Sequence, residues 1–303
     1  MNAELNGKLN KFKEELCPVC RREMHYLYTI ERFRPNFRIY ECPVCRLQKK
    51  ETTDNDDSKY YNEDYYAGKS EYSYIDERKQ NSFHAHVWKA RLKNISKFIP
   101  PPADFLDAGC SFGGFALQAK EMGYRANGLD VSEYAAEHAQ KNGLKTIQGK
   151  IKSGIFPDDS FDIVTMIEVM EHVSNPDETL SALSKMIRPG GLLVIQTANF
   201  AGMQAKREKE KYHYYLPGHL YYYSRKNLTE LLKKHKFSRV KFYPGVDFSL
   251  IAKLLKSRGN FHSLLDYLKW FSISWYHLKS KIAFGNFALT SSMVLYAFRD
   301  ENQ

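Results

Sequence analysis

From residue 104 onward, short strand-like stretches alternate with helical patterns, and this alternation limits the fold more than any other feature of the 303-residue chain. Strands separated by helices run parallel, because each helix carries the chain back across one face of the sheet. The sequence therefore predicts a doubly wound α/β domain with a largely parallel sheet. The strands are expected at Phe105–Leu106, Arg125–Leu129, Ser160–Ile167, Leu192–Gln196, Arg239–Tyr243 and Ser292–Phe298.

A glycine-rich loop follows the first of these strands. It reads Asp107-Ala-Gly-Cys-Ser-Phe-Gly-Gly114, and a helix is expected from about Phe115. Glycines let the backbone approach a ligand closely, and a helix N-terminus adds N–H groups that can face an anion. Asp130 ends the second strand 21 residues after Gly109, a spacing typical of a carboxylate that binds ribose hydroxyls. The loop therefore predicts a nucleotide-like cofactor.

Three further landmarks follow in order, namely Phe161-Asp162, the segment Glu168–His172 and the turn Pro189-Gly-Gly191. Together with the loop, they closely resemble the class I S-adenosylmethionine-dependent methyltransferases over about residues 76–245. The resemblance implies a Rossmann-like, seven-stranded sheet and S-adenosylmethionine as cofactor. An NAD dehydrogenase, the competing interpretation, would need G-x-G-x-x-G, which this loop does not have. The resemblance assigns cofactor contacts to Asp107, Gly109, Cys110, Ser111, Gly113, Asp130, Val131 and Ile151.

Two positions depart from the family pattern. Ser111 stands where the family usually has glycine, and we expect it to fit with a negative φ. Lys150 stands where many relatives carry an aspartate that meets the adenine amino group. Adenine would then be recognised by backbone groups and by packing against Ile151.

The candidate chemistry lies just beyond the expected strand Ser160–Ile167, in Glu168-x-x-Glu171-His172, with His219 on a later loop. In a helix, the first three of these residues would share one face. The pattern resembles metal-dependent O-methyltransferases of small RNA and of ubiquinone biosynthesis, which implies Glu168, Glu171, His172 and His219 as ligands of a divalent cation such as Mg²⁺. The alternative is a metal-free site in which His172 is a base or a substrate contact.

Four of the five cysteines form two identical motifs, Cys17-Pro-Val-Cys20 and Cys42-Pro-Val-Cys45. Two such turns can direct four thiolates at one tetrahedral zinc ion, which suits a structural role because no coordination position stays open. Strands are expected between them at Leu27–Ile30 and Phe37–Tyr40, and the arrangement resembles a zinc ribbon over residues 1–50. Two disulfides fit poorly in a chain for which no secretion signal is expected, and a redox dithiol would not need a matched second copy of the motif.

The rest of the chain flanks these two units. Residues 51–75 are predicted to form a Tyr-rich linker or lid, residues 76–245 the methyltransferase domain, and residues 246–303 a helical extension that ends in a strand. The aromatic side chains of Trp270, Phe271, Trp275 and Tyr276 are expected to cap the domain's own core, with contact to a membrane surface as the alternative. No run of 18 apolar residues occurs and the first 16 residues are polar, which predicts a cytoplasmic protein without a transmembrane segment.

The formal net charge of +10 is unevenly distributed, with +5 in residues 1–50, −6 in residues 51–199 and +11 in residues 200–303. Basic flanks suit an anionic substrate or partner, or a solvated lysine-rich surface. The plan of the chain, with its paired CPVC turns, Tyr-rich linker and Glu168–His172 segment, resembles bacterial methyltransferases of sugar and surface-polysaccharide pathways. This resemblance implies our first hypothesis, methyl transfer to an oxygen of a sugar or another small-molecule acceptor. RNA methylation, with the zinc ribbon and basic flanks on phosphates, is the second. A non-catalytic cofactor-binding module is the third.

Overall fold

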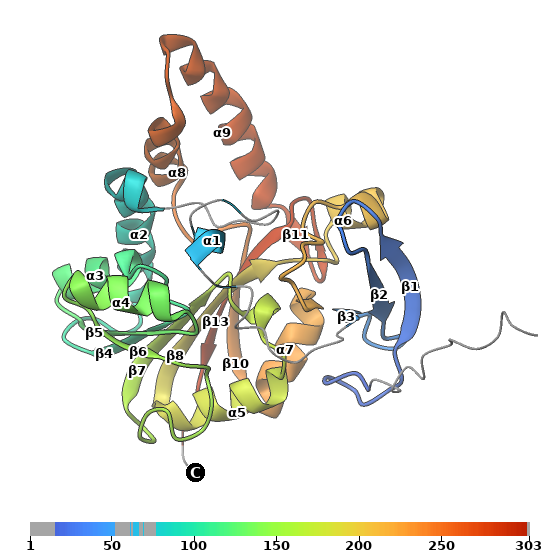
Figure 1. Ribbon diagram of the computed structural model, residues 1–303, viewed down its shortest axis with the longest axis horizontal. Coiled ribbons are helices and arrows are strands. Elements are labelled where there is room, and N and C mark those ends of the chain that lie inside the picture. Colours follow the sequence, from blue (N-terminus) through green and yellow to red (C-terminus); the bar gives the residue numbers. More distant parts are fainter. Residues whose placement is uncertain (1–15, 52–60, 62, 67–68, 70–76, 302–303) are drawn as a thin grey trace, which may run out of the picture.

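The computed structural model describes residues 16–51, 61, 63–66, 69 and 77–301 (Figure 1). Most of the predicted Tyr-rich segment, including Tyr60, Tyr72 and Tyr74, lies outside the described residues. The same holds for the first 15 residues of the predicted ribbon.

The centre of the molecule is a seven-stranded sheet in the order β10-β13-β8-β7-β4-β5-β6. Strands β4 to β8 pair in parallel, whereas β13 is antiparallel to both of its neighbours, β8 and β10. This confirms the predicted Rossmann-like, seven-stranded class. The bounds are β4 (Asp104–Ala108), β5 (Arg125–Asp130), β6 (Lys145–Gln148), β7 (Phe161–Ile167), β8 (Ile187–Ala198), β10 (Arg239–Pro244) and β13 (Ser292–Phe298).

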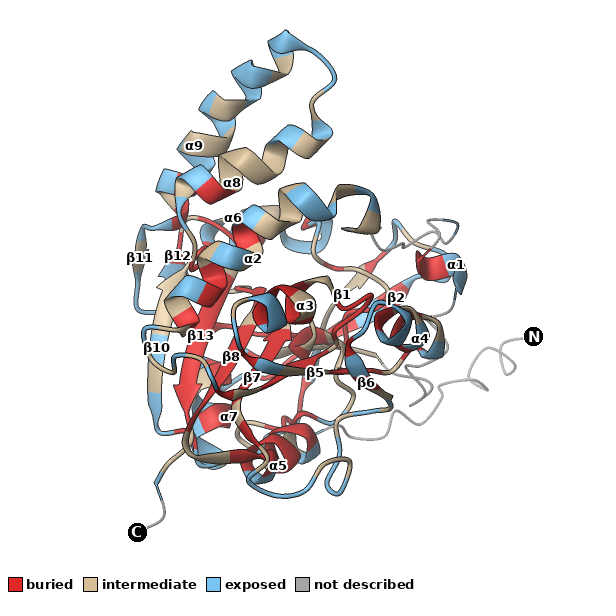
Figure 2. Ribbon diagram, turned by 90° about the vertical axis from the view of Figure 1, so that its left-hand side faces the viewer, coloured by how far each residue is buried: buried red, intermediate tan, exposed pale blue. Residues whose placement is uncertain are grey.

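Helices cover both faces of this sheet (Figures 1 and 2). Because side chains alternate along a strand, Leu193 and Ile195 of β8 face α5 and α7, while Leu192 and Val194 face α2 and α3. Ser224 caps α7 in a capping box, as its sequence predicted. The bounds are α2 (Asn81–Ile95), α3 (Gly114–Glu121), α4 (Glu133–Lys141), α5 (Pro176–Met186) and α7 (Arg225–Lys234).

The N-terminal ribbon forms a second sheet in the order β1-β2-β3-β9. Its first three strands are β1 (His25–Ile30), β2 (Phe37–Glu41) and β3 (Gln48–Lys50). The fourth, β9 (Tyr221–Tyr222), comes from the segment that follows β8, and the Lys50 amide donates to the Leu220 carbonyl over 2.9 Å. The ribbon and the main domain therefore share a sheet.

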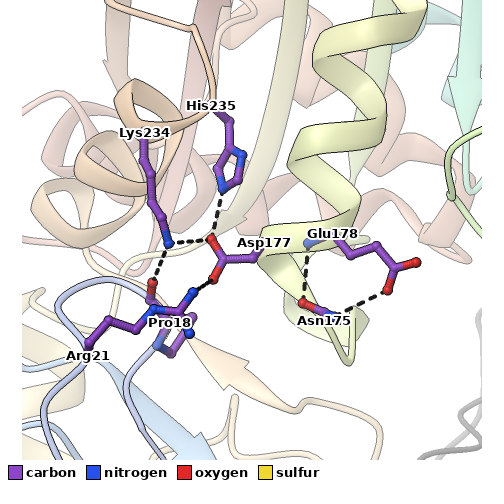
Figure 3. A network of polar contacts seen from close by, with 7 residues as sticks. All are labelled: Pro18, Arg21, Asn175, Asp177, Glu178, Lys234 and His235. Atoms are coloured by element: carbon purple, nitrogen blue, oxygen red, sulfur yellow. Dashed lines mark hydrogen bonds and ion pairs between the residues drawn. The ribbon is translucent and has the colours of Figure 1, made fainter.

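A polar network fastens the first cysteine turn to the main domain (Figure 3). The carboxylate of Asp177, in the first turn of α5, lies 3.1 Å from Arg21, 2.7 Å from Lys234 and 2.8 Å from His235. Lys234 also donates to the Pro18 carbonyl over 3.3 Å. The ribbon thus contacts the ends of both helices that cover one face of the sheet.

The remaining elements surround one edge of the sheet. Helices α8 and α9 form a hairpin that projects from the body of the molecule (Figures 1 and 2). The prediction that its aromatic residues cap the core is wrong for Phe271 and Trp275, whose exposed fractions are 77% and 61%. Within the described ranges, no helix has the length and apolarity needed to cross a bilayer. The bounds are α1 (Glu63–Tyr66), α6 (Met203–Glu208), α8 (Leu250–Ser257), α9 (Lys269–Ser280), β11 (Ala283–Phe284) and β12 (Phe287–Ala288).

Candidate active site and thiol cluster

The glycine-rich loop leaves the carboxyl end of β4 at Asp107, whose side chain is buried. The Thr165 hydroxyl of β7 donates to Asp107 Oδ1 over 2.6 Å, so the two neighbouring strands fix this carboxylate. Gly109 follows at φ +85°, and a Cβ at this position would lie 2.3 Å from Val169 Cγ2. Glycine is therefore required by both the backbone conformation and the contact with the segment after β7.

Ser111 has φ +50°, so the prediction of a negative φ is wrong. The reason lies in its amide, which donates to Asp130 Oδ2 over 2.8 Å and therefore points back toward β5. The Ser111 hydroxyl is buried without a hydrogen-bond partner among the described residues. Gly113 also has a positive φ, of 84°, and caps the N-terminus of α3.

Asp130 is buried at the end of β5. Its Oδ1 accepts from the Ser132 amide over 2.9 Å, while Oδ2 accepts from Ser111. Burial raises the pKa of Asp130, although these backbone hydrogen bonds act in the opposite direction. Each carboxylate oxygen has a second lone pair that could accept from a ribose hydroxyl. Val131 and Ile151 are half-buried beside it.

An aromatic cluster that the sequence only partly indicated covers the loop. Tyr66 of α1 contacts Phe112 edge to face at 5.1 Å, and Tyr65 and Tyr66 are both buried there. The Arg78 guanidinium also lies over the Phe112 ring, 3.9 Å from the ring centre. Tyr65 and Tyr66 therefore pack against the glycine-rich loop. Phe112 belongs to the loop motif, but no pattern in the sequence predicts that it contacts Tyr66 and Arg78.

The segment after β7 is not a helix, so the expected single face through Glu168, Glu171 and His172 is wrong. Glu168 has φ +56°, and only a 3-10 turn, Met170–His172, follows. The two carboxylates differ in their exposure to solvent. Glu168 is exposed and accepts from Gln196 Nε2, whereas Glu171 is buried with an exposed fraction of 2%.

The structure brings together Glu171, His172 and His219, each with one possible ligand atom within 4.8 Å of the others. Neither Glu171 oxygen has a hydrogen-bond partner in the described part of the chain. Burial raises the pKa of Glu171 well above its ordinary value, and repulsion from Glu168 adds to this. A buried, unsatisfied carboxyl group calls for a ligand or a proton.

The two histidines have the same tautomer. His172 Nδ1 lies 2.8 Å from the Gly218 carbonyl and His219 Nδ1 lies 2.9 Å from the Tyr214 carbonyl. A carbonyl oxygen only accepts, so each Nδ1 carries the proton and each Nε2 has a lone pair. The rings meet edge to face at 4.7 Å. Burial lowers the pKa of His172 to about 4 and that of His219 well below its usual value, which keeps both imidazoles neutral.

Tyr61 and Tyr214 were not identified as site residues from the sequence. The Tyr61 hydroxyl lies 2.8 Å from His172 Nδ1, and Tyr214 supplies the carbonyl that orients His219. Neither tyrosine stands in a motif, and both reach the site from loops. Their positions depend on how the Tyr-rich segment and the segment after β8 fold back.

The four predicted cysteines gather in a second cluster within the ribbon. The Sγ atoms of Cys17 and Cys45 are 3.4 Å apart, and those of Cys20 and Cys42 are 3.3 Å apart. All four are free thiols, and their sulfur atoms lie within 4.8 Å of one another. The two turns match in backbone conformation as well, since Arg21 and Arg46 each follow a motif with φ near 60°, at 58° and 61°. The donor set and its spacing fit a tetrahedral zinc ion.

Comparisons with known proteins agree with this fold. The methyltransferase domain family matches residues 79–241, more than half of the chain. A ubiquinone biosynthesis O-methyltransferase from Caulobacter sp. (strain K31) is 35% identical over 104 residues, which are 31% of this chain and 40% of that protein. The chain therefore matches less than half the length of this relative.

Two solved structures resemble the whole domain. Phosphoethanolamine N-methyltransferase 2 of Haemonchus contortus, in complex with S-adenosyl-L-methionine, has a TM-score of 0.52 and 16% identity, over 84% of this chain and 62% of that chain. A SAM dependent methyltransferase from Archaeoglobus fulgidus has a TM-score of 0.50 and 17% identity, over 73% of this chain and 97% of that chain. At these identities they show the shared fold. With the family match and the seven-stranded sheet, the chain belongs to the methyltransferase domain family.

Proposed function

We propose that the chain transfers a methyl group from S-adenosylmethionine to an oxygen of a small-molecule acceptor, such as a sugar. Family membership supports methyl transfer, and the O-methyltransferase relative supports oxygen as the acceptor atom. The observation that carries the proposal is the pair of neutral histidines, His172 and His219, beside the buried Glu171. A neutral imidazole nitrogen can accept the proton of a hydroxyl group.

The cofactor fits the residues after β4 and β5. The Ser111 hydroxyl is buried without a partner among the described residues, and Asp130 has acceptor capacity for ribose hydroxyls. When bound, S-adenosylmethionine supplies the electrophilic methyl group. The chain's part is to fix both reactants and to exclude water. With S-adenosylmethionine bound, His172 Nε2 would accept the proton of the acceptor hydroxyl group as that oxygen takes up the methyl group.

As the alternative, the same three side chains hold a divalent cation such as Mg²⁺, and His172 Nε2 is then a ligand and not the proton acceptor. One carboxylate and two imidazole nitrogens are suitable ligands, and two carbonyl groups fix the imidazole tautomers as they do in many metal sites. The cation would supply a positive charge that favours the deprotonated acceptor oxygen. Glu168, which points toward Gln196, stays a predicted fourth ligand.

We further propose that Cys17, Cys20, Cys42 and Cys45 hold one structural zinc ion. Four thiolates leave no coordination position open, so the ion would stabilise the ribbon rather than act on a substrate. Since β9 pairs with β3, the ribbon also fixes the segment that carries His219.

His172→Gln tests the proposed base. The imidazole would take part in proton transfer, so turnover should fall about 10²–10⁴-fold. His172 does not belong to the glycine-rich loop that would bind the cofactor. The dissociation constant of S-adenosylmethionine, measured by calorimetry, should stay the same. His213→Gln, which changes an exposed histidine of the segment that carries His219, is the control and should retain activity. Equal loss of turnover and of cofactor affinity in His172→Gln would overturn the assignment.

Binding of Mn²⁺, measured by electron paramagnetic resonance, tests the cation separately. The proposed ligands predict one site in the wild-type protein that is lost in Glu171→Gln. A site that survives this substitution would exclude Glu171 as a ligand. Activity that is indifferent to a mild chelator and to added Mg²⁺ would favour His172 as a metal-free base.

A further inference from the structure

The hairpin of α8 and α9, residues 250–282, stands away from the domain that the proposed function uses (Figure 1). Its base is fastened by the buried ion pair between Arg91 of α2 and Asp247, with 2.8 Å between Arg91 Nη2 and Asp247 Oδ1. Gln80 donates to the Gly259 carbonyl over 3.1 Å and so attaches the middle of the hairpin to the start of α2. The 3-10 turn Leu264–Leu268 lies at the outer end of the hairpin, and α9 leads from there back to the body of the molecule, where His277 and Ser280 are buried (Figure 2).

One face of this projecting part is apolar and exposed. Its residues recur at alternating steps of four and three, which places them along one side of a helix. The exposed fraction is 88% at Leu264, 77% at Phe271 and 61% at Trp275. Single exposed apolar residues are ordinary, but a continuous row marks an interaction surface. We call this row the hairpin stripe; it consists of Leu264, Leu268, Phe271, Trp275, Leu278 and Ile282.

Contacts inside the hairpin fix the direction in which the stripe faces. The Trp270 indole N–H donates to the Ser257 hydroxyl of α8 over 3.0 Å. The Lys253 ammonium of α8 lies 4.8 Å from the ring centre of Tyr276 in α9. These inward contacts use the opposite side of α9, so the stripe is left on the outer side.

The charge of the hairpin indicates what covers the stripe. Residues 250–282 contain six lysines and arginines but a single acidic residue, Asp266, for a net charge of +5. Asp266 is itself satisfied within the hairpin, by the amides of His262 and Ser263, each at 2.8 Å, and by Lys269. Two hairpins of this charge would repel one another. An anionic surface complements them, and aromatic and leucine side chains flanked by lysines suit the headgroup region of a bilayer.

The hairpin also rises from the edge of the sheet at which the candidate site lies. It is inserted between β10 and β13, and Ser292 at the start of β13 pairs with Ala198 at the end of β8. The parallel strand β7 ends at this edge with Ile167, next to the segment of His172. We propose that the hairpin stripe docks the protein on an anionic phospholipid surface. The docking places this edge of the sheet near the headgroups, where a lipid-linked or amphiphilic acceptor would be found.

Vesicle sedimentation with the full-length chain tests the docking, and it does not depend on the proposed methyl transfer. The protein should bind vesicles made of equal parts phosphatidylcholine and phosphatidylglycerol, and salt should weaken the binding. Vesicles of phosphatidylcholine alone should bind much less. Phe271→Ser should weaken binding about tenfold to a hundredfold, as expected from losing one inserted phenylalanine.

Tyr26→Ser, which removes an exposed aromatic residue of the ribbon (58% exposed, against 77% for Phe271), is the control and should bind like the wild type. Far-ultraviolet circular dichroism would establish that both variants are folded. Absence of binding to anionic vesicles, or equal binding by Phe271→Ser, would overturn the proposal. So would a lipid-free dimer, seen by analytical ultracentrifugation, that Phe271→Ser converts to a monomer, because a second copy would then cover the stripe.

Discussion

Gly109→Ala is the substitution that most sharply tests the geometry of the glycine-rich loop after β4. The structure offers a matched control in Gly143, because both glycines have φ +85°. They differ in their surroundings. A Cβ at Gly143 would meet no atom within 4 Å, whereas at Gly109 it would lie 2.3 Å from Val169 Cγ2. Comparing the two alanine variants therefore separates backbone strain from the collision.

Two contributions determine the expected loss of stability, namely the strain of the backbone and the collision with Val169. Alanine in the left-handed conformation costs roughly 1–2 kcal/mol, which is the whole effect expected in Gly143→Ala. Carbon atoms normally approach to about 3.5–4.0 Å, so in Gly109→Ala Val169 must move by more than about 1 Å. Such overpacking adds about 1–3 kcal/mol. Each kcal/mol lowers the Tm by roughly 2–4 °C in a domain of this size.

Differential scanning fluorimetry with and without S-adenosylmethionine gives both readouts. In Gly143→Ala, the Tm should fall by a few degrees and should still rise when S-adenosylmethionine is added. In Gly109→Ala, the Tm should fall further, and adding S-adenosylmethionine should no longer raise it. In Gly109→Ala with Val169→Ala, only the Val169 Cβ at 3.4 Å remains, so part of the loss should be recovered. Equal Tm losses in the two single variants would refute the account of why glycine is needed here.

Three further results follow from buried groups of the domain. Thr165→Val removes the donor to the buried Asp107 carboxylate and should lower the free energy of unfolding by about 1–3 kcal/mol in urea titrations, while Thr165→Ser should not. The ordinary histidine pKa of 6.5 is lowered to about 4 at His172, and burial also lowers the pKa of His219 well below its usual value, so the unfolded chain binds more protons than the folded chain below pH 6.5. Stability should therefore be complete above pH 6.5 and fall as the pH decreases toward about 4, and a flat profile in urea titrations would contradict this. Asp177→Asn should increase protease cleavage of the ribbon, because it weakens the network in Figure 3; unchanged cleavage would show that β9 alone fixes the ribbon.

The sequence predicted those parts of the fold that depend on local patterns. The strands and the capped helix α7 follow from apolar periodicity and from Ser224, and the structure has them within a few residues. The cysteine turns follow from the repeated motif, because a fixed spacing sets the local geometry. The loop after β4 was found for the same reason.

Long-range contacts could not be read from such patterns. The positive φ of Ser111 results from a hydrogen bond to Asp130, which lies on another strand. The pairing of β9 with β3 of the ribbon joins two segments that are far apart in the sequence, and no local pattern in either of them predicts this contact. The exposure of Phe271 was missed because an amphipathic aromatic helix has the same pattern whether it packs on its own core or on a partner. Glu168 was grouped with Glu171 by the resemblance to metal-dependent O-methyltransferases, and that resemblance does not reveal the 3-10 turn that the chain makes here.

The central claim is methyl transfer from S-adenosylmethionine to a small-molecule oxygen. The most direct test supplies methyl-labelled S-adenosylmethionine and the protein to an extract of its own cells, and then locates the label by fractionation. We expect label in a small-molecule or glycolipid fraction that resists ribonuclease, and its loss when His172→Gln replaces the wild-type protein. Label in RNA, or no transfer by a protein that binds the cofactor, would contradict the account.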